Sequence, residues 1–327
     1  MESAAAGGAW PLVTVITPAY NRADLIAETI DSVLAQDYPN LEYIVLDDGS
    51  ADATLEVIRG YEGRLRWERH PNMGETRTVN RGFELARGAI IGVVNSDDPL
   101  RPGAVRRLVE ALQATPTAVV AYPDWELIDD RGAVLRTVAT EPFTGAVDMV
   151  RLHHCLPGPG AFFRREVVER LGGRDVRFRY VGDLEFWFRA GLLGDFVRVP
   201  EPLATFRVHG GSTSVAQQGA AMAVEHVALL EVFYARPDLP QELRDVAREA
   251  RASACYVAGC CCGRWALWRR LGYYARALRL APAVFLRRYP GRLLVMLLTL
   301  CGLPYAEVFH VLADLRRRVA GHVGEPV

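Results

Sequence analysis

The first 122 residues alternate between strand-like and helix-like patterns. Short apolar or β-branched runs predict strands at 12–17, 42–46, 65–69, 89–94 and 118–122. Amphipathic stretches with the period of a helix separate these runs, at 25–36, 50–59, 75–86 and 102–114. Strands joined by helices of this length are typical of parallel βαβ units with right-handed crossovers, so we expect an α/β fold with a mostly parallel sheet.

The pattern changes after Tyr122. Further on, we predict a hairpin from 125–128 and 133–138, short strands at 161–163, 196–199 and 204–208, and a helix at 183–190. From Val215 onward almost every segment has helical periodicity. We therefore divide the chain into a short N-terminal segment (1–11), an α/β domain (12–214) and a helical, arginine-rich C-terminal region (215–327).

Composition narrows the class of protein. Half of the 327 residues are hydrophobic and the net charge is −1, which suits an ordinary globular core and excludes a disordered chain. A dedicated nucleic-acid binder would be basic, so we expect no nucleic-acid partner. The charge is uneven, however, because 264–318 holds 11 arginines against two acids, a local balance of +9.

The cysteines and the N-terminus bear on location. Four of the six cysteines crowd 255–262, and none of the six has the spacing of a zinc site, so we expect buried, reduced thiols. Residues 1–10 lack the basic flank and apolar core of a signal peptide. Both features favour a cytoplasmic protein.

Polar residues follow three of the predicted strands, at Thr17–Arg22, Asp47–Ser50 and Asn95–Asp98. Ligands of open parallel sheets bind beyond the carboxyl ends of the strands, so these clusters are expected to meet one ligand. The alternative for each cluster alone is ordinary turn chemistry. Adjacent carboxylates at Asp97 and Asp98 would repel each other without a cation, which favours Mg²⁺ or Mn²⁺ with substrate phosphates; capping of the next helix is the alternative.

Six motifs together resemble family 2 glycosyltransferases of the GT-A fold, over residues 12–214: Thr17–Arg22, Leu46–Ser50, Asn80–Gly88, Asn95–Asp98, Gly182–Trp187 and Phe206–Ser212. The resemblance implies a Rossmann-like sheet with helices on both faces, followed here by a helical extension. It also implies metal-dependent, inverting transfer from a nucleotide-diphosphate sugar, with a UDP-sugar favoured. The acceptor would be a hydroxyl of a saccharide or lipid-linked molecule, in cell-surface polysaccharide or glycolipid synthesis.

The resemblance also implies roles for single residues. Thr17 and Asp48 match positions that hold the base, and Asp97 and Asp98 match the acidic pair that touches ribose and metal (Mn²⁺ or Mg²⁺). His209 matches a position near the diphosphate or metal, with a structural loop histidine as the alternative. The expected nucleotide site comprises Thr17, Pro18, Tyr20, Asn21, Asp48, Arg77 and Asp97.

Asp183 matches the catalytic base of the family. Inversion by a single displacement requires a carboxylate that takes the proton of the acceptor hydroxyl, and a helix start would keep Asp183 ionised. The alternative is that Asp183 only caps this helix. For the acceptor we expect contacts from Asp124, Trp125 and Glu185, with a structural role as the alternative for Glu185.

In the C-terminal region, Leu267, Leu271, Tyr274 and Leu278 recur at helical spacing. The apolar run 293–303 is shorter than the ~20 residues that span a bilayer. Two interpretations stay open: peripheral contact with the inner face of the membrane, or helices packed on the catalytic domain or another subunit.

Two rival functions fit the same fold. One is a nucleotidyltransferase, which would need a basic, glycine-rich loop after the first strand where this chain has Pro18–Asn21. The other is a catalytically silent GT-A-like scaffold, which would have no need of Asp97, Asp98 and Asp183 together.

Overall fold

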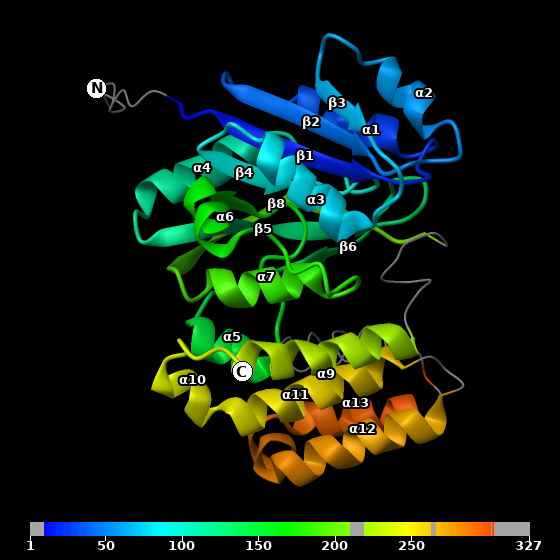
Figure 1. Cartoon of the computed structure of the whole chain (residues 1–327). Helices are drawn as coiled ribbons and strands as arrows, with labels where there is room; N and C mark the ends of the chain where they lie inside the picture. Colours follow the sequence, from blue (N-terminus) through cyan, green and yellow to red (C-terminus); the bar gives the residue numbers. More distant parts are fainter. Residues whose placement is uncertain (1–9, 210–218, 263–265, 302, 304–327) are drawn as a thin grey trace, which may run out of the picture. The chain divides into compact units, whose positions relative to one another are not determined.

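The structure is a computed structural model that describes residues 10–209, 219–262, 266–301 and 303 (Figure 1). The chain divides into two compact units. The α/β unit comprises Met1–Ala146 and Cys155–Ser212, and the helical unit comprises Val147–His154 and Thr213–Val327. The helical unit therefore includes a short segment, Val147–His154, that the expected domain limits of 12–214 and 215–327 assigned to the other part of the chain.

The α/β unit contains an eight-stranded sheet in the order β3-β2-β1-β4-β7-β5-β6, with β8 paired to β5. β1 pairs in parallel with β2 and β4, β3 with β2, and β8 with β5, whereas β7 is antiparallel to both β4 and β5. The expected mixed, mostly parallel sheet is confirmed. The strands are β1 (Val13–Ala19), β2 (Leu41–Asp47), β3 (Arg66–Arg69), β4 (Ile90–Val93), β5 (Ala118–Ile128), β6 (Val134–Val138), β7 (Phe162–Arg164) and β8 (Asp195–Arg207).

Helices cover both faces of this sheet. Val13 and Val15 of β1 lie in the core shared with α1 and α4. On the other face, the ring of Phe83 from α3 contacts Phe163 of β7 and Phe186 of α7, with centroids 5.8 and 5.9 Å away. The helices of this unit are α1 (Ile26–Leu34), α2 (Thr54–Arg59), α3 (Glu75–Leu85), α4 (Ala104–Ala114), α6 (Arg165–Leu171) and α7 (Gly182–Ala190).

Two predicted pairs of strands are single long strands in the structure. The segments 118–122 and 125–128 form β5, and 196–199 and 204–208 belong to β8, which ends at Arg207. The register between β5 and β8 shifts on both sides of Asp124, next to Pro123. Proline lacks the N–H that a ladder needs, so the sequence pattern breaks there although pairing continues on either side.

The helical unit has its own apolar core, which includes Tyr256, Tyr274, Phe285 and Met296. α5 joins this unit through specific contacts: Arg292 donates to the carbonyl oxygen of Leu152 at 3.1 Å. The elements are α5 (Ala146–Leu152), α9 (Ala220–Tyr234), α10 (Gln241–Asp245), α11 (Ala247–Cys261), α12 (Leu267–Leu280), the π-helix η1 (Val284–Arg288) and α13 (Pro290–Leu300).

Part of the predicted apolar stripe of α12 packs inside the helical unit, whereas Leu267 is 41% exposed. Tyr274 is buried and its hydroxyl lies 2.7 Å from Oγ1 of Thr299 on α13, while Leu278 packs against the same core. Across the described residues, no helix has the length and apolar character needed to cross a membrane. All six cysteines are free; Cys255, Cys260 and Cys262 are buried as expected, but Cys301 is exposed.

Candidate active site

The loops that follow β1 and β2 are bonded to each other. The backbone N–H of Asn21 donates to Oγ of Ser50 at 3.0 Å, and Oδ1 of Asn21 accepts from the N–H of Ala51 at 2.8 Å. Gly49 has φ +73°, and a Cβ there would lie 2.7 Å from the backbone nitrogen of Asn72. Glycine is therefore required where the β2 loop meets the segment leading into α3.

The expected base-binding residues lie at this junction. Thr17 is buried, and its Oγ1 lies 3.0 Å from the hydroxyl of Tyr43. The carboxylate of Asp48 accepts the backbone N–H groups of Met73 at 2.7 Å and Gly74 at 3.0 Å. In this structure Asp48 thus holds the loop before α3, at the place where the loops after β1 and β2 meet.

The other expected nucleotide residues differ in exposure. Pro18 is buried within β1, whereas Tyr20 is exposed just beyond its end. Arg77 is exposed on α3 and forms no ion pair with any residue in the described part of the chain. Tyr20 and Arg77 are therefore open to a ligand in solution.

Asp97 connects the ends of three strands. Its Oδ2 accepts from Nε of Arg22, after β1, at 3.1 Å, and lies 2.9 Å from Nε2 of His209, after β8. The Asp97 and His209 side chains each keep 14% of their surface exposed. The structure therefore brings Asp97 and His209 together from positions far apart in the sequence.

Asp98 points into the protein. It is buried, and its two carboxylate oxygens accept from the backbone N–H of Arg207 at 2.8 Å and from Nδ2 of Asn95 at 3.0 Å. Burial raises the pKa of Asp98 to about 8, and the negative charge of Asp97 adds to this shift. Asp98 therefore joins the end of β8 to the loop after β4, and Asp97 is the acid of the pair that faces outward.

Arg207 is a residue of this site that sequence reasoning missed. Its side chain is 1% exposed and forms an ion pair with Glu28 of α1. Its Nε donates to the carbonyl oxygen of Asp97 at 3.0 Å, and Nη1 donates to that of Asp129 at 3.1 Å. The sequence feature that could have identified Arg207 is its charge, because it lies within a predicted strand and inside the motif Phe206–Ser212.

Asp183 is the one exposed residue of α7; the other eight residues of this helix are buried. The N-cap of α7 is Val181, whose side chain makes no capping bond, whereas Oδ1 of Asp183 accepts the backbone N–H of Leu184 at 2.7 Å. Asp183 is therefore in the first turn of α7, where its carboxylate bonds to a backbone N–H of the helix and stays exposed.

The starts of α3 and α7 lie side by side. A Cβ at Gly182 would be 3.1 Å from Oγ1 of Thr76, which itself donates to the carbonyl oxygen of Phe178 at 2.8 Å. Because Glu75 precedes Thr76 and Asp183 follows Gly182, these two acids are neighbours at the same edge of the sheet.

Glu75 links Asp183 electrostatically to Asp97, and sequence reasoning missed it. Partial loss of water raises the pKa of its carboxyl, the negative charges of Asp183 and Asp97 raise it further, and Arg174 opposes the shift. Nη1 of Arg174 lies 3.4 Å from Oε1 of Glu75. The charges of both expected functional acids, Asp97 and Asp183, therefore raise the pKa of the same carboxyl, that of Glu75.

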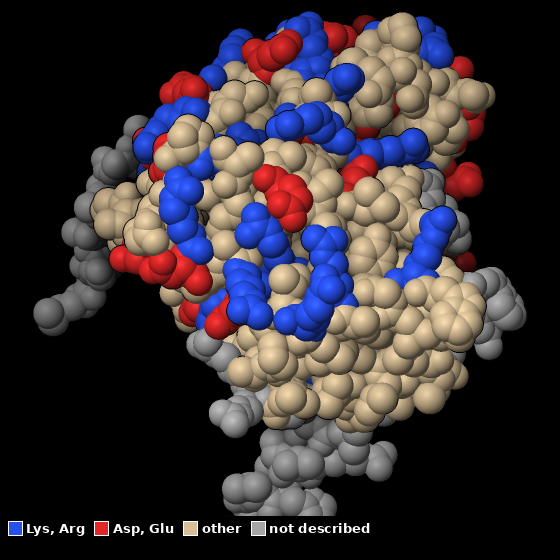
Figure 2. All heavy atoms as spheres, turned by 60° about the horizontal axis from the view of Figure 1, so that its bottom comes forward, with Lys and Arg blue, Asp and Glu red and all other residues tan. Residues whose placement is uncertain are grey.

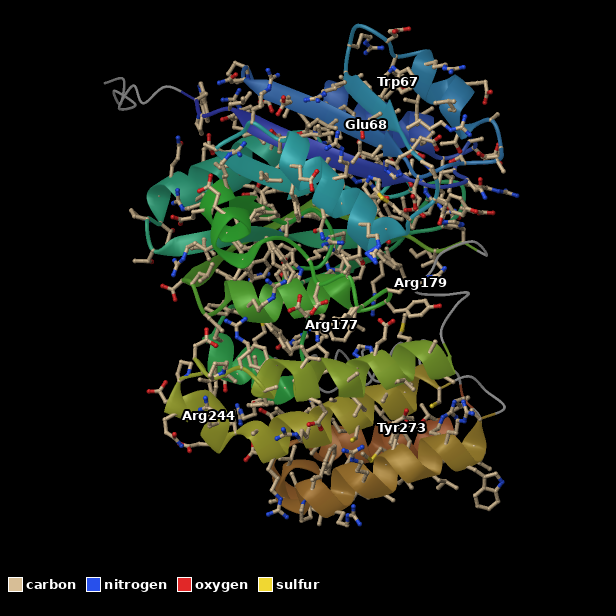
Figure 3. The ribbon with its side chains drawn as sticks, viewed as in Figure 1. Trp67, Glu68, Arg177, Arg179, Arg244 and Tyr273 are labelled. Atoms are coloured by element: carbon tan, nitrogen blue, oxygen red, sulfur yellow. The ribbon has the colours of Figure 1, made fainter. Side chains whose placement is uncertain are left out.

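Arg174 belongs to an arginine-rich loop between α6 and α7. Its backbone is fixed by Asn80 of α3, whose Oδ1 accepts from the N–H of Arg174 and whose Nδ2 donates to its carbonyl oxygen, both at 2.8 Å. Arg177 and Arg179, labelled in Figure 3, are on the same loop. This loop supplies positive charge near the otherwise acidic edge of the sheet.

The expected acceptor residues have different surroundings. Asp124 is buried, and Arg198 donates three hydrogen bonds to its carboxylate, at 2.8, 2.9 and 3.1 Å. Glu185 is buried in an ion pair with Arg189 of the same helix. Trp125 is half-buried, so part of its ring is available for contact.

The chemistry of Asp97 and His209 fits a divalent cation that is also held by phosphates. Among the described residues, no three His, Cys, Asp or Glu side chains group as metal ligands; Asp97 and His209 are a pair that the structure brings together. Loss of water is the main cause of the raised pKa values of Asp98 and Glu75, and the negative charge of neighbouring carboxylates adds to both shifts. Mg²⁺ and Mn²⁺ commonly complete their coordination with substrate phosphates and water.

Sequence comparison identifies relatives of the α/β unit. The model for "Glycosyl transferase family 2" matches residues 14–172. An uncharacterized glycosyltransferase of Mycobacterium tuberculosis is 31% identical over 205 residues, which cover 61% of this chain and 76% of the relative. Three other uncharacterized bacterial glycosyltransferases are 27 or 28% identical, and the chain spans 66 to 70% of their length.

Solved structures share the fold. TarS 1–349 of S. aureus, in complex with UDP-GlcNAc, has a TM-score of 0.60 at 16% identity and covers 86% of this chain and 90% of its own. The mannosyltransferase PcManGT of Pyrobaculum calidifontis, in complex with GDP-Man and Mn²⁺, has a TM-score of 0.56 at 22% identity, with coverages of 93% and 80%. At these identities the likeness shows the fold alone.

The sequence relatives establish the family, and the solved structures establish the GT-A architecture that carries the converging strand ends. The chain belongs to glycosyl transferase family 2 and is a glycosyltransferase.

Proposed function

We propose that this glycosyltransferase moves a sugar from a nucleoside-diphosphate sugar to a hydroxyl acceptor with inversion at the anomeric carbon. The observation that carries the proposal is the convergence of Arg22, Asp97 and His209 from three strand ends, in the electrostatic neighbourhood of Asp183. A UDP-sugar is favoured, since the structural neighbour TarS binds UDP-GlcNAc, although PcManGT binds GDP-Man.

The proposed donor site follows the edge formed by the loops after β1, β2 and β4. Its residues are Thr17, Pro18, Tyr20, Asn21, Asp48, Arg77 and Asp97. Tyr20 and Arg77 are exposed and Asp97 is partly exposed, so these three have the surface that contact with a nucleotide requires. Thr17 and Asp48 shape the base pocket from within, because their side chains hold the strand and the loop in place.

Asp97 and His209 would hold a divalent cation, Mn²⁺ or Mg²⁺, and Asp98 would support them from inside the protein. When bound, such an ion neutralises the negative charge of the nucleoside diphosphate that leaves. The guanidinium of Arg22, bonded to Asp97, lies next to the same charge and orients the carboxylate.

Asp183 is the proposed base. In one displacement, the acceptor oxygen bonds to the anomeric carbon, the bond to the diphosphate breaks, and the hydroxyl proton passes to the Asp183 carboxylate. Exposure on an otherwise buried helix gives that carboxylate access to an acceptor. Trp125 offers a half-exposed ring on which an acceptor sugar could stack.

The proposed acceptor is a saccharide or lipid-linked hydroxyl used in cell-surface polysaccharide or glycolipid synthesis. One relative, the hyaluronan synthase of Pasteurella multocida, is 28% identical over 218 residues, which cover only 22% of its length. We further propose a cytoplasmic enzyme whose helical unit contacts the inner face of the membrane, where a lipid-linked acceptor would be reached.

Donor hydrolysis tests the proposal. A panel of UDP- and GDP-sugars is incubated with the full chain and Mn²⁺, and the nucleoside diphosphate and the anomer released are followed by NMR. We expect one donor class to be cleaved, an inverted sugar product, and loss of activity with chelator. Release of a nucleoside monophosphate, retention of configuration, or equal rates with chelator would each contradict the corresponding part of the proposal.

A further inference from the structure

The last helices of the described chain expose large apolar side chains. Trp268 of α12 is 83% exposed, Leu286 of η1 is 61% exposed and Leu297 of α13 is 54% exposed, with Leu267 and Leu294 above 40%. Isolated exposed leucines are common, but several on consecutive elements form a patch that requires an explanation.

These residues lie on the outward sides of α12 and α13. The inward side of α12 carries Arg270 and Tyr274, which are buried, and Trp268 is on the opposite side by helical spacing. On α13, Val295 and Met296 are buried while Leu294 and Leu297 are exposed. The exposed apolar side chains of α12 and α13 therefore do not belong to the core of the helical unit.

The two helices are adjacent, so their exposed sides belong to one surface. Nη1 of Arg270 bonds to the carbonyl oxygen of Thr299, and the Tyr274 hydroxyl bonds to the side chain of the same residue. The end of α13 thus lies beside the first half of α12. In Figure 3, Tyr273 marks α12 in the helical unit.

The surface is also basic. From Leu267 to Leu303 the sequence has no acidic residue and seven arginines. Of those whose side chains are described, Arg270 is buried, Arg276 lies 3.9 Å from Glu231 and Arg292 bonds to Ser253. Arg269 and Arg279 are exposed and have no ion-pair partner among the described residues. Figure 2 shows arginine side chains beside a broad area of uncharged residues on the face turned toward the viewer.

We infer that α12, η1 and α13 form an interfacial docking face for an anionic lipid surface. Trp268, Leu286, Leu294 and Leu297 enter the boundary between headgroups and acyl chains, and Arg269 and Arg279 contact the negative headgroups. This inference extends the membrane contact of the proposed function. It assigns the contact mainly to residues outside the predicted stripe, in which Leu267 is exposed but Tyr274 is buried.

Charge favours a lipid surface over a second copy of the chain. A symmetric contact between two such faces would oppose arginine to arginine with no acid between Leu267 and Leu303 to balance them. An anionic membrane offers the opposite charge to the arginines and an apolar phase to the tryptophan and leucines.

Vesicle flotation of the full chain tests this inference without donor or acceptor. Vesicles of phosphatidylcholine with phosphatidylglycerol are compared with vesicles of phosphatidylcholine alone. We expect binding to the anionic vesicles that is at least tenfold tighter and that weakens as salt rises. Equal binding to both, or binding to neither, overturns the inference.

Variants then locate the face. Replacing both Trp268 and Leu297 by Ser should weaken binding by about tenfold or more. Arg269→Gln and Arg279→Gln should each weaken it about fivefold, the equivalent of about 1 kcal/mol per arginine. Val224→Ser in α9, at a side chain 57% exposed, is the matched control and should bind as wild type.

Two further measurements separate the competing outcomes. Sedimentation velocity shows whether the Trp268 and Leu297 changes dissociate a dimer; a dimer that breaks while vesicle binding is absent assigns the face to a second copy. Circular dichroism checks folding, and the two arginine variants remain informative if the double serine variant unfolds. Donor hydrolysis in solution needs no vesicles, so failure of docking and failure of the proposed activity are distinguishable.

Discussion

Asp97 and Asp98 are neighbours in the sequence with opposite environments. Asp97 keeps part of its carboxylate exposed beside Arg22 and His209, whereas Asp98 is buried and bonded to the N–H of Arg207. We expect Asp97→Asn to weaken Mn²⁺-dependent binding of nucleoside diphosphate by roughly 10- to 100-fold, because a cation ligand is lost. Calorimetry with Mn²⁺ and with chelator measures this difference.

Asp98→Asn is the comparison at the adjacent position. The oxygen of the new amide can accept one of the two hydrogen bonds. Its NH₂ group then faces the other donor, either the N–H of Arg207 or Nδ2 of Asn95, and no hydrogen bond can form there. We expect a loss of about 1 to 3 kcal/mol in the free energy of unfolding, with metal-dependent binding largely retained. Binding abolished by Asp98→Asn in a folded protein, and unaffected by Asp97→Asn, would reverse the assignment.

Asp183→Asn tests the base. The side chain keeps its size and its place in α7 but loses the ability to take a proton, so transfer should fall on the order of 10²-fold or more. Donor affinity should change little. The matched control is Glu166→Gln, an exposed acid in the first turn of α6, which should leave turnover unchanged. Normal turnover of the Asp183 variant would remove it from the mechanism.

Within α7, the two acids of the first turn have separate tasks. Glu185 is buried and paired with Arg189, which also donates to the carbonyl oxygens of Leu171 and Gly173. Glu185→Gln leaves a buried guanidinium without its counter-charge, so we expect a loss of roughly 3 kcal/mol or more in the free energy of unfolding. Urea denaturation measures it; Asp183→Asn, at an exposed position, should shift the midpoint far less.

A pair of histidines joins the residue that follows α5 to α9, and we expect this pair to make the helical unit sensitive to acid. Nε2 of His153 lies 2.9 Å from Nδ1 of His226. Burial lowers the pKa of His226 to about 4, and burial, His226 and Arg292 lower that of His153 well below its usual value. Both imidazoles are therefore neutral in the folded protein.

The sign of the pH dependence follows from these shifts. In the unfolded chain each histidine takes a proton near pH 6.5, but folded His226 does so only near pH 4. The contribution of His226 to stability is therefore constant above about pH 6.5 and falls as the pH decreases toward 4, by about 3 kcal/mol. The raised pKa of Asp98 changes stability in the opposite direction, so the test is the difference between wild type and His226→Gln in thermal unfolding from pH 8 to 4.5. Wild type should lose stability relative to this variant as the pH falls; a difference that stays the same would contradict the assignment.

For the whole molecule, the division into units predicts the effect of truncation. Segment Val147–His154 belongs to the helical unit, and Arg292 and His226 of that unit bond to it. A chain that ends at Gln218 should therefore leave the buried Met149 and Val150 without their cover in that unit. We expect a lower unfolding temperature and binding of an apolar dye. A truncated chain as stable as the full one would show that the segment does not depend on the helical unit.

Local pattern determined the elements of the α/β unit. The predicted helix at 75–86 is α3 (Glu75–Leu85) and the predicted helix at 183–190 is α7 (Gly182–Ala190), because periodicity and capping signals act within a few residues. The strand ends that carry Asn21, Asp48 and Asp97 were also evident, because polar residues directly after apolar runs are visible in one dimension.

Tertiary structure decided which side chains are free to act. Asp98 and Glu185 look as available in the sequence as Asp97 and Asp183, but Arg207 and Arg189 occupy them, and those partners are set by packing. Glu75 lies near Asp183 because the first turns of α3 and α7, more than 100 residues apart in the sequence, are in contact. Burial and pairing depend on contacts between distant segments, so the sequence alone determined the family and its motifs, while the folded chain determined which carboxylates are buried and paired and which are exposed.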